Sequence, residues 1–199
     1  MKNAIDIIRS EHRALAAVLS GLSAVVDGIG SGKFEPDFTL LAAMIEYVTE
    51  VPEKVHHPKE DGYLFPALRK RSAAAAAIIV DLESEHHVGP SKIATLKVAL
   101  DDYRRAGAAG LPAFRERVKA YVDFQWQHMS KEERLVLPLA REALTAEDWA
   151  AIDGAFNANG NPWEGPAGEY KQLFTRIVSI APDPIGVGDR SHSAHEGSR

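Results

Sequence analysis

Four histidine-containing segments recur in this chain as two similar pairs, and this duplication limits the folds that it can adopt. The tripeptide that ends in His12 returns 74 residues later and ends in His86. A histidine followed four residues later by glutamate occurs at His56 and returns 72 residues later at His128. Such self-similarity predicts that one structural unit is present twice. Because each copy carries both kinds of segment, we expect the unit to be a pair of helices.

Apolar residues recur every three or four positions through most of the first 144 residues, which is the period of helices with one buried face. Glycines and prolines divide this pattern into four long helices. The first runs from Ile5 to the glycines that begin at Gly28, the second from Asp37 towards Leu68, the third from Ser72 to Gly107, and the fourth from about Pro112 to Ala143. Pro52 and Pro58 lie inside the second helix, and we expect them to bend or break it because proline removes a backbone hydrogen bond.

The chain changes character after residue 144. Amphipathic stretches predict a helical extension over residues 145–182, which either packs on the bundle or forms a dimer face. Residues 183–199 are rich in proline, glycine, serine and histidine, and we expect this tail to be disordered. The predicted organisation is an all-α, metal-binding four-helix domain over residues 1–144, followed by the extension and the tail.

Composition narrows the possible functions. The 199 residues carry a net charge of −5 without a basic run, so nucleic acid is not an expected partner. No apolar run approaches the roughly 18 residues of a membrane span, and the first residues lack the apolar core of a secretory signal. We therefore expect a cytoplasmic protein, as a monomer or a homodimer. The absence of cysteine excludes thiolate metal sites and a cysteine nucleophile.

The histidines and glutamates of the repeated segments have the spacing of side chains that meet. Residues four apart lie on one face of a helix, so His56 and Glu60 point into the same space, as do His128 and Glu132. His12 and His86 lie within apolar stripes that face the bundle interior, where an ionisable group is costly unless it is paired or ligated. The pattern predicts a shared metal site in the bundle.

Six ligands suit two metal ions better than one. If each ion takes two histidines, and both carboxylates and one solvent-derived oxygen bridge the pair, each ion is five-coordinate with an open position for a small ligand. Imidazole and carboxylate together suit iron, and manganese or zinc less well in this interpretation. The expected ligands are His12, His56, Glu60, His86, His128 and Glu132.

Four neighbouring side chains have less definite roles. His57 has Met129 as its counterpart in the repeat, so the duplication does not support ligation. We expect His57 to be solvated or to lie behind the ligands, with ligation as the less favoured alternative. Asp61 and Glu133 are counterparts in the repeat, and each follows a candidate ligand by one residue, off the face that holds the ligands. They either form hydrogen bonds to the ligands or lie on the surface. Tyr63 is expected to pack in the core, while a bond to the metal site remains an alternative.

A ferritin-like di-iron scheme is a competing interpretation. Such proteins use Glu-x-x-His segments, and Glu53 with His56 and Glu83 with His86 have this spacing. The scheme leaves His12 and His128 without a role, so it explains less of the pattern.

The repeated segments resemble the hemerythrin-like, HHE cation-binding family over about residues 3–143. The resemblance is carried by Glu11-His12, Glu85-His86, the two His-x-x-x-Glu segments, Leu64-Phe65-Pro66 and Val136-Leu137-Pro138. It implies an up-down four-helix bundle with a non-haem di-iron centre between the helices. Carried over residue by residue, it implies the same six side chains as iron ligands.

The resemblance also implies a range of functions. Di-iron centres of this family bind dioxygen reversibly, or act on or sense oxygen, nitric oxide, peroxide or iron. Oxygen-carrying hemerythrins have a further histidine one turn after the third-helix histidine, where this chain has Pro90. This departure favours redox chemistry with peroxide, as in a catalase-like enzyme, over reversible oxygen carriage. The alternative is an iron- or oxygen-sensing or metal-storage module without turnover.

Overall fold

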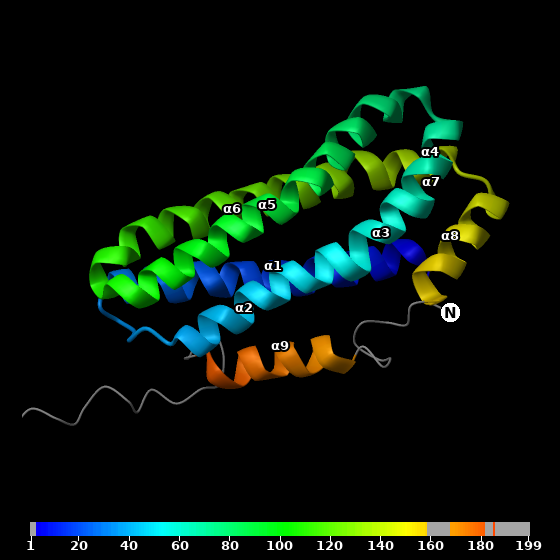
Figure 1. Cartoon of the computed structure of the whole chain (residues 1–199). Coiled ribbons are helices and arrows are strands. Elements are labelled where there is room, and N and C mark those ends of the chain that lie inside the picture. Colours follow the sequence, from blue (N-terminus) through cyan, green and yellow to red (C-terminus); the bar gives the residue numbers. More distant parts are fainter. Residues whose placement is uncertain (1–2, 159–167, 182–184, 186–199) are drawn as a thin grey trace, which may run out of the picture.

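The computed structural model describes residues 3–158, 168–181 and 185, and every regular element within them is helical. Four long bundle helices run alternately in opposite directions (Figure 1). The first is α1 (Ala4–Gly30), and the second combines α2 (Phe38–Val51), α3 (His57–Lys59) and α4 (Phe65–Arg71). The third is α5 (Ala76–Ala106), preceded by the 3₁₀ turn Ala73–Ala75, and the fourth joins α6 (Leu111–Lys131) to α7 (Leu137–Ala143). The expectation of an all-α bundle is confirmed for the residues that the structure describes.

Side chains start two of these helices by binding free backbone N–H groups. Asn3 accepts a hydrogen bond from the N–H of Asp6, and Asp37 accepts from Thr39 and Leu40. The first N–H groups of a helix have no partner within it, so such caps favour the observed starting points.

Three π-helical turns interrupt the regular winding of the second and fourth bundle helices: Pro52–His56, Glu60–Leu64 and Glu132–Val136. Each turn is closed by a backbone N–H that donates to the carbonyl five residues earlier and belongs to the residue before a proline. The pairs are His57 to Pro52, Phe65 to Glu60, and Leu137 to Glu132. A proline ring clashes with the carbonyl four residues back, and a wider turn relieves this clash. The second helix therefore continues through Pro52 and Pro58 in widened turns.

The hydrophobic core has two parts, one on each side of a buried polar layer. One part is formed by the C-terminal half of α1, by α2, by the second half of α5 and by α6. The other joins the first turns of α1 to α4, α7 and the start of α5. The polar layer between them holds the histidines and glutamates of the repeated segments.

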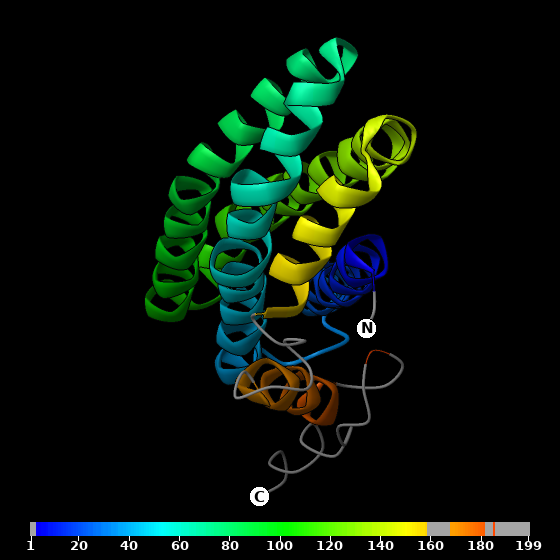
Figure 2. The same cartoon turned by 90° about the vertical axis from the view of Figure 1, so that its right-hand side faces the viewer.

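The predicted extension packs against the bundle. Helix α8 (Ala146–Ala158) lies against α1 and the Glu60–Leu64 turn, with Ile152 and Phe156 buried. Helix α9 (Gly168–Ile180) lies along α2 and buries Ile177 (Figure 2). Apart from Ile185, the tail predicted to be disordered lies outside the described residues.

Helix α1 is, in the part of the chain that the structure describes, the one helix long and apolar enough to cross a membrane by length and composition. Half of that apolar stretch is buried inside the bundle. It contributes side chains to both parts of the core, and this accounts for its apolar composition.

Candidate metal centre

The structure brings together all six side chains that the sequence nominates. His12 lies on α1, His86 on α5 and His128 on α6. His56 and Glu60 flank the short helix α3, and Glu132 begins the π-helical turn of the fourth bundle helix. All six are buried in the polar layer between the two parts of the core.

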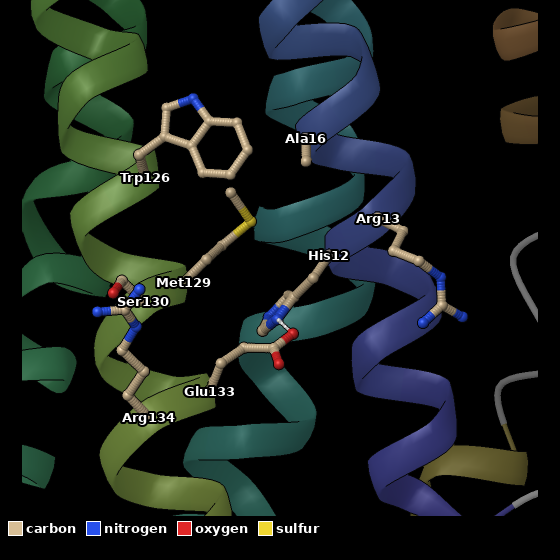
Figure 3. A pocket seen from close by; sticks show the side chains of 8 residues that line it. All are labelled: His12, Arg13, Ala16, Trp126, Met129, Ser130, Glu133 and Arg134. Atoms are coloured by element: carbon tan, nitrogen blue, oxygen red, sulfur yellow. Dashed lines mark hydrogen bonds and ion pairs between the residues drawn. The ribbon is translucent and has the colours of Figure 1, made fainter.

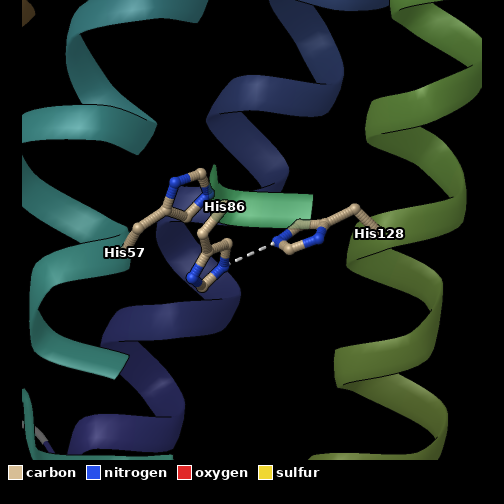
Figure 4. A group of neighbouring side chains, drawn as sticks. All are labelled: His57, His86 and His128. Carbon is tan, nitrogen blue, oxygen red and sulfur yellow. Dashed lines mark hydrogen bonds between the residues drawn. The ribbon is translucent and has the colours of Figure 1, made fainter. Parts of the chain in front are cut away.

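The imidazoles form two pairs of nearly identical geometry, one from each copy of the repeat. We call His12 with His56 the first half of the site, and His86 with His128 the second half. The Nε2 atoms lie 3.1 Å apart in the first half and 3.2 Å apart in the second. The ring centroids are 4.9 Å apart, and the planes are inclined by 57°, in both halves. Figure 4 shows the second half.

The two glutamates lie between these halves. The contacts from Nε2 to carboxylate oxygen are His56–Glu60 at 3.3 Å, His86–Glu60 at 3.7 Å, His12–Glu132 at 3.1 Å, His128–Glu132 at 3.0 Å and His86–Glu132 at 3.9 Å. Glu60 and Glu132 thus each direct one oxygen to the first half and the other oxygen to the second. Their four oxygens are buried and have no hydrogen-bond partner. This arrangement suits carboxylates that bridge two cations.

A second layer of carboxylates orients the imidazoles. The Nδ1–H of each ring donates to a further acidic side chain, in the pairs His12–Glu133 at 3.1 Å, His56–Glu11 at 2.6 Å, His86–Asp61 at 2.8 Å and His128–Glu85 at 2.9 Å. With Nδ1 occupied in this way, the Nε2 atom of each ring points to the centre, as in carboxylate–histidine–metal triads. Asp61 and Glu133 therefore bond to predicted ligands and do not stand alone on the surface.

Glu11 and Glu85 were not assigned a role from the sequence. The signal was present, because each precedes a histidine in the duplicated Ser-Glu-His tripeptide. Each also binds a lysine: Lys59 lies 2.9 Å from Glu11, and Lys131 lies 2.5 Å from Glu85. These lysines are counterparts in the repeat, so the duplication includes the ion pairs behind the imidazoles.

The electrostatics of the cluster favour bound cations. Burial by itself lowers an imidazole pKa, but the neighbouring carboxylates outweigh it. Asp61 and Glu132 raise the pKa of His86 to about 9, and Glu132 raises that of His128 to about 10. Burial would raise the pKa of Glu132, yet the imidazoles hold it well below its usual range. The site therefore retains positive charge beside its buried carboxylates, either as protons or as metal ions.

The structure decides the positions of two neighbours. Of the alternatives for His57, the solvated one is excluded, because the residue is only 7% exposed and its ring stacks on His86 with centroids 3.9 Å apart (Figure 4). The expected core packing of Tyr63 is wrong, because this side chain is 50% exposed. Tyr63 lies within the Glu60–Leu64 π-helical turn, which changes the register, so a spacing of seven residues from His56 no longer marks one face.

A pocket of about 300 Å³ lies between α1 and α6, and His12 forms part of its wall (Figure 3). The lining residues are His12, Arg13, Ala16, Trp126, Met129, Ser130, Glu133 and Arg134. Of the four paired imidazoles, only that of His12 lines this pocket, so the pocket borders the first half of the site.

A family model for the hemerythrin HHE cation-binding domain matches residues 3–140. The chain belongs to this family. The matched region contains all six candidate ligands and the first three bundle helices, and it ends inside α7, before α8 and α9. None of the curated proteins compared with the chain matches it.

The donor set of this hemerythrin-like domain fits metal cations. Donor atoms of His12, His56, Glu60 and Glu132 lie within 4.8 Å of one another, and so do those of Glu60, His86, His128 and Glu132. The two groups share both glutamates. Buried carboxylate oxygens without hydrogen-bond partners, facing imidazole nitrogens, form a candidate cation-binding centre with two adjoining parts.

Proposed function

We propose that this protein is a non-haem di-iron protein that reacts with dioxygen or a related small oxidant such as peroxide or nitric oxide. In this proposal His12 and His56 hold one iron, His86 and His128 hold the other, and Glu60 and Glu132 bridge the pair. The observation that carries the proposal is that each buried glutamate directs one oxygen to each half of the site.

The ligand types favour iron over the alternatives. Imidazole combined with carboxylate suits iron, with manganese and zinc as lesser candidates, and the chain has no cysteine to favour softer metals. When bound, the iron pair supplies one-electron redox chemistry towards small oxidants.

The chain's own residues prepare the site for this chemistry. The outer carboxylates hold the imidazole rings in fixed orientations, so little reorganisation is needed when the cations bind. The two parts of the hydrophobic core enclose the site and restrict access of water. The pocket beside His12 lies on the side of the ring that faces Glu133, next to the first half of the site.

An optical experiment tests the proposal. The protein is loaded with ferrous iron without air, its iron content is measured, and spectra are recorded after exposure to dioxygen or to peroxide. We expect two iron ions per chain and the near-ultraviolet and visible bands of a paired ferric site. Decay of peroxide on repeated additions would identify a catalase-like activity, and a stable reversible dioxygen spectrum would identify a carrier. Fewer than two iron ions per chain would contradict the proposal.

A sensing role is the second candidate, and one contact favours it. Lys59 is buried between the Glu11 carboxylate and the ring of Phe156 on α8, with Nζ 4.8 Å from the ring centroid. Because Glu11 orients His56, the docking of α8 is linked to the site. If the protein senses iron, removal of iron should increase hydrogen exchange in α8, and Phe156→Ala should abolish that difference. Exchange in α8 that is independent of iron would contradict this role.

The same proposal includes the location of the protein, its oligomeric state and its partners. The protein is expected in the cytoplasm as a monomer or homodimer, with a small diatomic molecule or peroxide as its partner. Neither nucleic acid nor a membrane is an expected partner.

A further inference from the structure

One buried imidazole at the centre is not explained by the six-ligand scheme. His57 comes from the second bundle helix, directly after His56, and its ring is nearly parallel to that of His86, with the planes inclined by 17°. It also meets the ring of His128 edge-on, with centroids 5.3 Å apart. A nitrogen of each of these three imidazoles lies within 4.8 Å of the other two. The second half of the site thus has three imidazoles at ligand distance.

His57 has the same kind of acidic neighbour as the four paired imidazoles. Its Nδ1 lies 3.7 Å from the carboxylate of Glu53, one turn earlier on the same helix. The nearest oxygen of Glu53 is buried and has no hydrogen-bond partner, and neither does the Nδ1 atom itself. A short adjustment of either side chain would produce the carboxylate–imidazole pair that orients the other rings.

The third bundle helix leaves room for this arrangement. A Cβ atom at Gly89 would lie 2.9 Å from Glu53 Oε1, so a larger residue there would displace the carboxylate. Pro90, one turn after His86, is exposed. The space beside His86 is therefore filled from the second helix, by His57 with Glu53 behind it.

We infer that His57 is a seventh metal ligand, which joins His86 and His128 on the ion of the second half. This inference rests on the proposed function, because it requires a metal pair in the site. The two halves then differ: the first offers two imidazoles and the second offers three, with the two glutamates shared.

The first test compares the wild-type protein with His57→Met by iron titration and Mössbauer spectroscopy. Methionine is chosen because the equivalent position of the repeat holds Met129, which is buried. In the wild type we expect two iron ions in unequal environments, seen as two quadrupole doublets of equal area. In the variant we expect the two environments to become alike and the affinity for one iron to fall at least roughly tenfold.

His87→Met is the matched control, because His87 also follows a candidate ligand but is exposed. It should leave both affinities and both doublets unchanged. Circular dichroism of the metal-free proteins verifies that helix content is preserved. A second variant, Glu53→Gln, keeps the shape of the side chain and removes its charge, and it should weaken the same iron roughly tenfold or less.

The outcomes separate this inference from the proposed function. Two iron ions in the wild type with equal environments, or unequal environments that persist unchanged in His57→Met, would overturn the role of His57 and leave the di-iron proposal standing. Fewer than two iron ions in the wild type would overturn both.

Discussion

The two halves of the site have the same inner geometry but different surroundings. Nε2 separations of 3.1 and 3.2 Å and identical ring inclinations show that the repeated segments produce the same local arrangement twice. Outside this inner layer the halves diverge. The side chain of Lys59, behind the first half, is 2% exposed, whereas that of Lys131, behind the second, is 27% exposed. His57, next to the second half, has Met129 as its counterpart.

The difference shows which part of a metal site local sequence encodes and which part depends on packing. Helical spacing orients the imidazoles and carboxylates equally well in both copies. Helix α8 covers only one of the two lysine–glutamate pairs, through Phe156. The same ion pair therefore lies in a low-dielectric environment in one half and near solvent in the other.

Loss of a shared carboxylate should affect both halves, so it is expected to have the largest effect. In Glu132→Ala we expect both iron ions to be lost, because this side chain contacts imidazoles of both halves. The stabilisation by bound metal, about 2.7 kcal/mol for each ion at a free concentration of 100 Kd, should disappear with them. Metal analysis and thermal unfolding with and without iron measure this. His56→Ala should also lower occupancy, and two retained iron ions in both variants would contradict the ligand assignment.

Competition between protons and metal should affect both halves as pH changes. In the metal-free protein His86 and His128, with pKa values of about 9 and 10, are protonated at neutral pH, and metal must displace these protons. Affinity should therefore rise with pH, roughly tenfold per unit for each proton displaced, and level off above pH 10. Titration with zinc, which is not oxidised, in weakly buffered solution measures the release. Release of no protons at pH 8 would contradict the raised pKa values.

Removing the equivalent lysines tests the difference in burial. Lys59→Met should destabilise the metal-free protein by about 3 kcal/mol, because it leaves Glu11 buried without its lysine. The His56 imidazole still neutralises part of this charge, so the cost is at the lower end for a broken buried pair. Lys131→Met should cost less than about 1 kcal/mol, because its pair is partly solvated. Denaturant unfolding compares the two, and equal losses would show that burial does not distinguish them.

The smallest effect on stability and iron affinity is expected for a substitution at an exposed position where the two copies of the repeat differ. Tyr63 and its counterpart Leu135 are 50% and 48% exposed, so Tyr63→Leu makes the two copies alike without touching the site. Stability should change by less than about 0.5 kcal/mol, and iron affinity should not change. Loss of iron in this variant would show that Tyr63 contacts the site in solution.

Much of the molecule was predictable because it follows from helical periodicity. The expected family and the all-α bundle are confirmed. The six candidate ligands meet in one layer, although their ligation remains a prediction. Pairs such as His56 and Glu60 meet because residues four apart share a helical face even where the helix is distorted.

Other features depended on the tertiary structure. The position of Tyr63 was mispredicted because a π-helical turn adds a residue to its winding, which a constant period of 3.6 residues does not include. The burial of His57 and Lys59 depends on contacts from distant segments: Gly89 leaves room for Glu53 behind His57, and Phe156 covers Lys59. The sequence by itself determined which side chains share a helical face, because that depends on spacing along one helix. The tertiary structure decided which of them are shielded from water, because shielding depends on residues far apart in the chain.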